Sequence, residues 1–308
     1  MERVQEKKRH ASQHELMIVL PGILLCGLVM ILGLYGAELL GDLMILFGLL
    51  APGSKTPVSG IFVAILVGII LRNTLRLPDI FSHGITFSLK YLLKAGIILL
   101  GLRLSLVQAL KLGAFGLPLI FLCISAGLFI TLYLTKKMNQ SQRLGTLIAT
   151  GTGICGVTAI MATAPVIKAK ENEISYAVAN VTVFGLTGMV LYPFLANYIF
   201  AGDPVRAGLF LGTAIHDTAQ VTGAALIYEQ LFQSPIAVEA AMVTKLTRNL
   251  FIIAVIPFVS YLLFKNSKAD APKEKLPPWY KFIPLFVIGF LLLSFVRTIG
   301  DATLDSGG

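Results

Sequence analysis

The sequence predicts an all-α fold, a polytopic bundle of membrane helices. Of its 308 residues, 56% are hydrophobic and only 13% are charged, whereas a soluble domain carries about 25% charged residues. The mean hydropathy is +0.82, and the apolar residues form long runs rather than amphipathic stripes. These observations exclude a soluble enzyme, a nucleic-acid-binding protein, a coiled coil and a disordered chain.

Nine membrane spans are expected, because a helix needs about 20 apolar residues to cross the hydrocarbon core of a bilayer. They lie near residues 16–35, 58–73, 83–102, 113–135, 144–166, 174–200, 207–228, 236–264 and 282–298. A shorter apolar run at 43–50 cannot cross, and we expect a re-entrant or interfacial segment there.

The spans divide the chain into four parts. These are a cytoplasmic tail at 1–15, a transmembrane bundle at 16–264, a cytoplasmic linker rich in Pro and Lys at 265–281, and the start of a truncated C-terminal repeat at 282–308.

The distribution of basic residues predicts the orientation in the membrane. The net charge of +9 could indicate a nucleic-acid partner, but Lys and Arg lie mostly in short loops between apolar runs. With nine alternating spans and a cytoplasmic N-terminus, 15 of them fall on the cytoplasmic side and 5 on the other. Such a bias is typical of membrane topology. We therefore expect a multi-pass protein of the inner membrane, surrounded by the lipid bilayer, without a nucleic-acid partner.

The span 144–166 contains three closely spaced glycines, Gly151, Gly153 and Gly156. They match the G-x-G-x-x-G dinucleotide pattern, but that pattern needs a preceding strand and a following acidic residue. Glycines also favour unwinding, and neighbouring Thr hydroxyls can satisfy the freed backbone groups. We expect a broken helix whose half-helix N-terminus can bind an anion. Close packing through small residues is the alternative.

The span 207–228 holds an unusual number of polar residues, including His216, Asp217 and Gln220. Polar groups at membrane depth are costly and mark functional sites. His216 titrates near neutrality, so His216 or Asp217 can carry a coupling ion. The alternative is a polar network that only locks two helices together. Gly208 and Gly212 form a small-x-x-x-small pattern that predicts helix packing.

Lys245 and Arg248 lie nine or more residues from either end of the apolar run 236–264. They are three positions apart and therefore share one helix face. Snorkelling to the membrane surface is the alternative to a functional role, but it would need a long reach from this depth.

Together these clusters predict a substrate site and an ion-coupling pair. The candidate ion-coupling residues are His216 and Asp217. No metal site is expected, because the three cysteines lie far apart and no His or Cys accompanies His216 at ligand spacing. The candidate substrate-binding residues are Thr150, Gly151, Thr152, Gly153, Cys155, Gly156, Thr158, Thr213, His216, Thr218, Gln220, Lys245 and Arg248.

Four motifs carry a resemblance to a known family. They are GIILLGLRLS at 96–105, GICGVTA at 153–159, HDTAQV at 216–221 and KLTR at 245–248. With them the chain resembles the YeiH-type bacterial inner-membrane proteins, commonly labelled candidate sulfate exporters, over about residues 60–300.

The resemblance implies the architecture of the cation–proton antiporter and anion transporter superfamily: inverted repeats, two crossing broken helices and an elevator-like movement. Family members usually carry two further C-terminal helices with a second Gly-Leu-x-x-Ser element like that at Gly101–Ser105. The resemblance therefore implies that the second repeat is incomplete in this chain.

The expected function is secondary transport of a small anion, namely sulfate or a related oxyanion or organic acid, coupled to a proton or sodium ion. A Na⁺/H⁺ or K⁺/H⁺ antiporter is one alternative, with Asp217 binding the cation and Lys245 competing with it. A second alternative is an inactive or structural membrane protein, because of the truncation. An enzymatic alternative is an intramembrane hydrolase that uses Cys155 and His216. We do not expect it, because apolar surroundings disfavour the reactive thiolate. No cofactor is expected, and a homodimer is an expected assembly.

Overall fold

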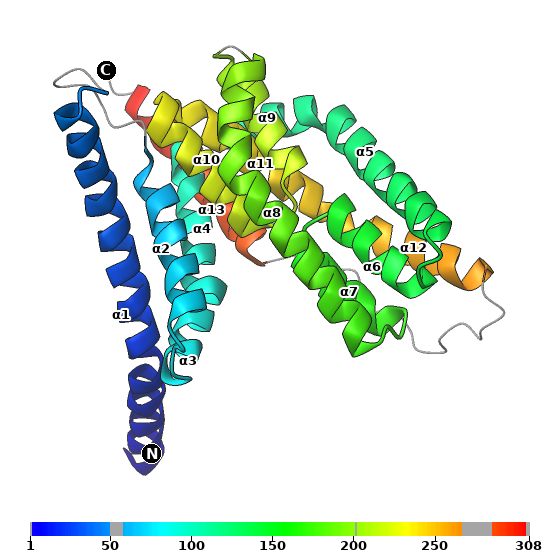
Figure 1. Ribbon diagram of the computed structural model, residues 1–308, viewed down its shortest axis with the longest axis horizontal. Helices are drawn as coiled ribbons and strands as arrows, with labels where there is room; N and C mark the ends of the chain where they lie inside the picture. Colours follow the sequence, from blue (N-terminus) through cyan, green and yellow to red (C-terminus); the bar gives the residue numbers. More distant parts are fainter. Residues whose placement is uncertain (1, 50–57, 201, 267–284, 306–308) are drawn as a thin grey trace. The chain divides into compact units, whose positions relative to one another are not determined.

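In the computed structural model of the chain, every regular element among the described residues is helical, which confirms the all-α prediction (Figure 1). The chain divides into two compact units, Met1–Ile97 and Ile98–Gly308. The structure describes residues 2–49, 58–200, 202–266 and 285–305.

The first unit is built around one long helix, α1 (Glu2–Leu46). The helices α2 (Gly60–Thr74) and α3 (Ile80–Phe87) pack against it, and α3 continues through a π-helical turn, η1 (Ser88–Leu92), into α4 (Leu93–Leu100). Small residues let these helices approach closely. A Cβ atom at Gly84 of α3 would lie only 2.6 Å from the Cα atom of Gly22 in α1.

The helix α1 extends beyond the predicted first span at both ends. The predicted tail at 1–15 is helical from Glu2 onward. The predicted re-entrant segment at 43–50 is described up to residue 49. It is not a separate segment there, because Leu43–Leu46 form the last turn of α1. The helix ends where Gly48 adopts a φ of 71°, the left-handed conformation typical of helix ends. Of the predicted linker, all but residues 265–266 lies outside the described residues.

The second unit contains the remaining helices, and each predicted span coincides with one helix or with adjoining helices. Among the described residues of the whole chain, four helical segments are long and apolar enough to cross a membrane, and two of them, Leu106–Lys137 and Glu171–Phe200, lie in this unit. The helices α11 and α12 together form a fifth candidate, bent by 45°. The elements are η2 (Gly101–Arg103), α5 (Leu106–Lys137), α6 (Gln142–Gly153), α7 (Val157–Val166), α8 (Glu171–Phe200), α9 (Pro204–Ala214), α10 (Thr218–Phe232), α11 (Pro235–Leu250), α12 (Ile252–Asn266) and α13 (Leu285–Asp305).

The helices α6 and α7 form a re-entrant hairpin, which corrects the predicted crossing at 144–166. The Ser141 hydroxyl before α6 donates a hydrogen bond to the Glu173 carboxylate after α7, so both ends of the segment lie together. A Cβ atom at Gly151 would lie 2.9 Å from the Ile160 side chain, whereas nine residues of straight helix rise about 13.5 Å. Hydropathy shows only that an apolar segment is long enough to cross the membrane. It does not distinguish a helix that crosses from a hairpin that returns to the same side.

The helices α9 and α10 form a second hairpin, which corrects the predicted crossing at 207–228. The helix α9 packs along the first half of α11 and runs in the same direction. A Cβ atom at Gly208 would lie 2.5 Å from the Ala237 carbonyl oxygen, and one at Gly212 would lie 2.7 Å from that of Ala241. This close approach confirms the predicted packing role of the two glycines. Because α11 begins directly after α10 ends, the start of α9 lies beside the end of α10.

The two hairpins enter the second unit from opposite ends (Figure 1). They are joined by α8, whose 30 residues make a helix about 45 Å long. The base of the first hairpin defines the Ser141 end of the unit. At the other end, the Arg103 end, Arg103 forms an ion pair with Glu229 near the end of α10. A hairpin followed by a long helical segment thus occurs twice in opposite orientations, which is the arrangement of an inverted repeat.

Candidate functional site

The tips of the two hairpins, residues 154–156 and 215–217, meet inside the second unit. Gly156 has a φ of 64°, a conformation that strongly favours glycine. A Cβ atom at this position would lie 3.3 Å from the Cα and Cβ atoms of Asp217. The structure therefore confirms the predicted break within 150–158 and brings it against the polar cluster at 213–218.

Lys245 of α11 holds both tips. Its side chain is completely buried, and its ammonium group donates hydrogen bonds to the carbonyl oxygens of Ile154 at 3.0 Å and Ile215 at 3.2 Å. A third hydrogen bond goes to the carbonyl oxygen of His216. Since a lysine ammonium has three donors, all of them are directed at the hairpin backbone.

Arg248 lies one helical turn further along α11 and repeats this pattern. Its Nε atom donates to the Gly153 carbonyl oxygen at 2.9 Å, and one terminal nitrogen donates to that of Thr213 at 2.6 Å. The other terminal nitrogen donates to the Thr152 carbonyl oxygen. The guanidinium group thus also bridges the two hairpins.

These carbonyl groups belong to the ends of α6 and α9, where a helix has no donors of its own left for them. A helix C-terminus carries a partial negative charge. Lys245 and Arg248 therefore compensate the C-terminal ends of both first hairpin helices and tie the tips to α11. The depth of Lys245 and Arg248 in the membrane was predictable from the sequence. Their hydrogen-bond acceptors were not, because these are backbone carbonyl groups, which every residue has.

The second helices of the hairpins begin at the same place, with their positive N-terminal ends. Asp217 caps α10, since its carboxylate accepts a hydrogen bond from the Ala219 backbone N–H at 2.8 Å. The cap position of α7 is Gly156, which offers no side chain for the first N–H groups. The Thr158 side chain, in the first turn of α7, is exposed. Of the four helix ends at the tips, only the N-terminus of α7 has no charged or hydroxyl side chain as a cap, although the Cys155 sulfur lies against the backbone of Ala159 in its first turn.

The predicted threonines have different roles in the structure. The hydroxyls of Thr150 and Thr213 donate to carbonyl groups of their own helices. The Thr218 hydroxyl instead accepts a hydrogen bond from the amide of Asn249 on α11 at 3.3 Å. Thr152 contributes its backbone carbonyl to Arg248. Of the predicted threonines, Thr152 and Thr158 are the two whose hydroxyls have no hydrogen-bond partner among the described residues.

Several buried polar atoms near the tips lack a hydrogen-bond partner among the described residues. Gln220 donates from its amide to the Thr182 carbonyl of α8 at 3.1 Å, while its amide oxygen stays unpaired. Asn249 and Thr244 on α11 were not predicted as site residues, although Asn249 directly follows Arg248 in the sequence. The unpaired atoms are His216 Nδ1, Gln220 Oε1, Thr244 Oγ1 and Asn249 Oδ1.

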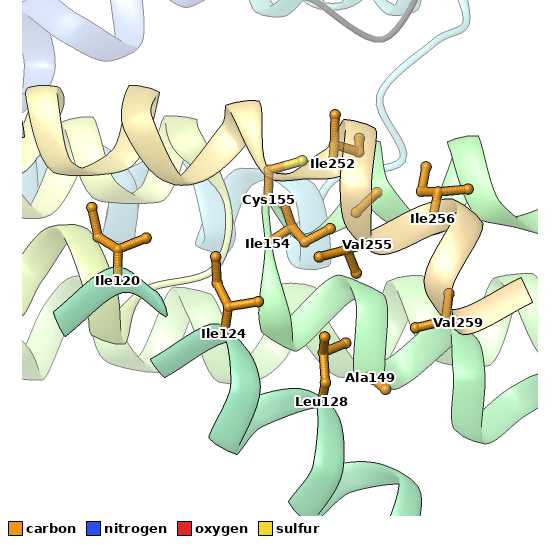
Figure 2. Close-up of a cluster of buried hydrophobic side chains, with 11 residues drawn as sticks. Ile120, Ile124, Leu128, Ala149, Ile154, Cys155, Ile252, Val255, Ile256 and Val259 are labelled. Atoms are coloured by element: carbon orange, nitrogen blue, oxygen red, sulfur yellow. The ribbon is translucent and has the colours of Figure 1, made fainter. Parts of the chain in front are cut away.

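Cys155 is the predicted site residue with the least polar surroundings. Figure 2 shows it with Ile154 among apolar side chains of α5 and α12. Its neighbours include Ile124 of α5 and Ile252 of α12. At the first tip, the backbone therefore faces the cations of α11 while these two side chains belong to the hydrophobic core.

A family model and individual relatives assign the chain to the same family. A family model described as conserved hypothetical protein 698 matches residues 21–305. A UPF0324 membrane protein of Streptococcus agalactiae is 35% identical over 280 residues, covering 91% of this chain and 77% of the relative. One of Streptococcus pneumoniae is 36% identical over 273 residues, covering 89% and 75%, and one of Fusobacterium nucleatum is 34% identical over 252 residues, covering 82% and 70%.

No solved structure matches the chain. The relatives are named membrane proteins, and the apolar helices of the structure agree with that description. The chain is therefore a multi-pass membrane protein, and it belongs to the YeiH-like family described as conserved hypothetical protein 698.

Proposed function

We propose that the protein is a secondary transporter that moves a small anion, sulfate or a related oxyanion or organic acid, across the inner membrane. The observation that carries this proposal is the N-terminus of α7, which has no charged or hydroxyl cap, at the meeting point of the two tips. A helix N-terminus at membrane depth offers free N–H groups and a positive partial charge to an anion.

The charges around the tips favour an anion over a cation. Lys245 and Arg248 are both buried, and Asp217 is the only acidic residue within the tip segments 154–156 and 215–217. With a neutral His216, this set carries one net positive charge. In surroundings of low dielectric constant, such a charge attracts an anion strongly. The cations act on the anion through their charge, because their donors are held by backbone carbonyls.

The anion would bind to the first N–H groups of α7, with the hydroxyls of Thr152 and Thr158 as further donors. His216, whose Nδ1 atom is buried and unpaired among the described residues, is one candidate for ion coupling. Asp217 caps α10 through one oxygen, and its second oxygen is the other candidate for ion coupling. Transport is favoured over hydrolysis because the only sulfur nucleophile at the tips, Cys155, lies in an apolar cluster.

The hairpins also strengthen the case for a cytoplasmic N-terminus. Two returns instead of two crossings move Lys168 and Lys170 to the cytoplasmic side and Arg206 away from it. The counts of 15 and 5 basic residues become 16 and 4. The corrected topology therefore follows the positive-inside rule better than nine crossings do. Hairpins of opposite orientation suit an elevator-like cycle with access from alternate sides.

The test is uptake of radiolabelled sulfate by proteoliposomes containing the Thr158→Val variant. Loss of a hydroxyl that donates to a charged ligand should reduce uptake at low sulfate concentration about tenfold. The matched control is Thr187→Val, which removes an exposed hydroxyl on α8 that bonds only to its own helix and should transport normally.

Other outcomes would contradict the proposal. Sodium- or potassium-driven proton movement without sulfate uptake would identify a cation antiporter. A folded protein that moves no ion in any assay would identify a structural role. Equal uptake by Thr158→Val and Thr187→Val would remove the N-terminus of α7 from the binding site.

A further inference from the structure

The first unit contains a cavity of about 600 Å³ between α1, α2 and α3. Its wall is half-buried and apolar where Leu25 and Val29 of α1 face Leu71 of α2 and Phe81 of α3. Exposed polar side chains line another part of it, among them Arg72 and Asp79. The cavity therefore combines an apolar wall with one charge of each sign, and its volume is in the range of small-ligand sites.

The side chains of Arg72 and Asp79 form no ion pair among the described residues. Asp79 stands at the N-cap position of α3, yet its side chain makes no capping hydrogen bond. The two side chains line the same cavity without bonding to each other. Opposite charges left apart on one wall fit a ligand that carries both charges itself.

The position of the cavity along the helices fits a lipid. The contact between Gly22 and Gly84 sets the first turns of α3 beside the beginning of the apolar stretch Met17–Leu46 of α1. Arg72 and Asp79 flank the connection between α2 and α3 and so lie near a membrane surface. Leu25 and Val29 lie further along the apolar stretch, at the depth of acyl chains.

We propose that this cavity binds a zwitterionic phospholipid with a protonated amine, such as phosphatidylethanolamine. The guanidinium group of Arg72 binds the phosphate, because it offers paired donors to such oxygens. The carboxylate of Asp79 accepts hydrogen bonds from the ammonium group. An acyl chain lies along Leu25, Val29 and Phe81. The site lies in the first unit and does not depend on the transport function proposed for the hairpin tips.

The proposal distinguishes between lipid headgroups. Phosphatidylglycerol has the phosphate but no cation, so Asp79 repels it. Phosphatidylcholine has a cation without N–H donors, so it cannot donate hydrogen bonds to Asp79. Phosphatidylethanolamine alone among the three satisfies both side chains.

The experiment is native mass spectrometry of the purified full-length chain, exposed to equal amounts of the three lipids. The native protein should retain phosphatidylethanolamine about fivefold over the other two, as expected for partly exposed ionic contacts. Asp79→Asn should lower the bound phosphatidylethanolamine and raise the phosphatidylglycerol, a crossed change that misfolding does not produce. Arg72→Gln, an independent variant, should lower both. The matched control is Arg76→Gln, which changes an exposed arginine of the same connection that does not line the cavity.

Two results would overturn the proposal. One is equal retention of all three lipids, or a preference for phosphatidylglycerol, by the native protein. The other is an Asp79→Asn variant that keeps the native lipid ratio. Because the readout is a ratio measured within one sample, a lower yield of folded variant does not mimic either result.

Discussion

The backbone of Asp217 lies so close to Gly156 that a methyl group on Gly156 would stand 3.3 Å from the Asp217 Cα atom. The two residues come from different hairpins and are 61 positions apart in the sequence. Gly156 is needed twice at this point, for its positive φ of 64° and for the space that a side chain would fill.

The first prediction concerns this contact. Gly156→Ala should lower the free energy of unfolding by about 1–3 kcal/mol, the cost of a strained backbone conformation, and should reduce ion flux by separating the tips. Thermal unfolding in detergent and flux in proteoliposomes measure the two effects. Gly96→Ala is the control, since a Cβ atom there meets nothing within 4 Å. Native stability and flux in Gly156→Ala would show that the tips tolerate a wider spacing.

The second prediction separates two roles for Lys245. If it compensates the carbonyl groups at the tips, Lys245→Met should lower the free energy of unfolding by about 3 kcal/mol or more, because each buried carbonyl left without a partner costs about 1–3 kcal/mol. The loss should be measurable without any added anion. Lys111→Met, an exposed lysine on α5, should have little effect. Native stability combined with weaker anion binding would instead make Lys245 a direct substrate ligand.

The third prediction tests the hairpins by labelling single cysteines with a membrane-impermeant maleimide. In a background free of the three native cysteines, Lys137→Cys and Lys170→Cys should react from the same side of the membrane. Arg206→Cys should react from the opposite side. In an arrangement of nine crossings, Lys170→Cys and Arg206→Cys would each react from the other side, so one labelling experiment decides between the two topologies.

The fourth prediction concerns the ion pair at the Arg103 end. Arg103 and Glu229 are partly buried, with side-chain exposures of 35% and 24%. Arg103→Glu should lower the free energy of unfolding by about 1 kcal/mol, and the exchange Arg103→Glu with Glu229→Arg should recover part of it in thermal unfolding. The same exchange at Arg297 and Asp301, whose side chains are 50% and 42% exposed, should change little.

The helices and the first break were predictable from the sequence, because hydropathy indicates where helices lie and the glycines at 151–156 favour unwinding. The second break, at 215–217, contains no glycine, and a second broken helix was implied only by the family resemblance. The hairpins were not predictable in this way. The segment 144–166 is long enough to cross, and its return depends on the contact between Ser141 and Glu173, 32 positions apart. Such long-range contacts leave no local pattern in one sequence.

The candidate site was predictable as a set of residues but not as a set of roles. The buried cations and the polar cluster stood out because a membrane interior excludes such groups. That Lys245 serves three carbonyl groups, and that Thr150 and Thr213 bond within their own helices, follows from backbone geometry. The amino-acid type alone carries no information on these partners.

The hydrogen bonds between α11 and the two hairpins restrict how these elements can move. Lys245 and Arg248 make six hydrogen bonds, three to each hairpin at or next to its tip. Hydrogen bonds to charged groups contribute about 1.5–3 kcal/mol each to stability. Separation of the two tips would therefore break several strong hydrogen bonds at once. The tips and α11 behave as one rigid body. In the proposed transport cycle, this body must therefore move past its neighbours as one unit, without separation of the two tips.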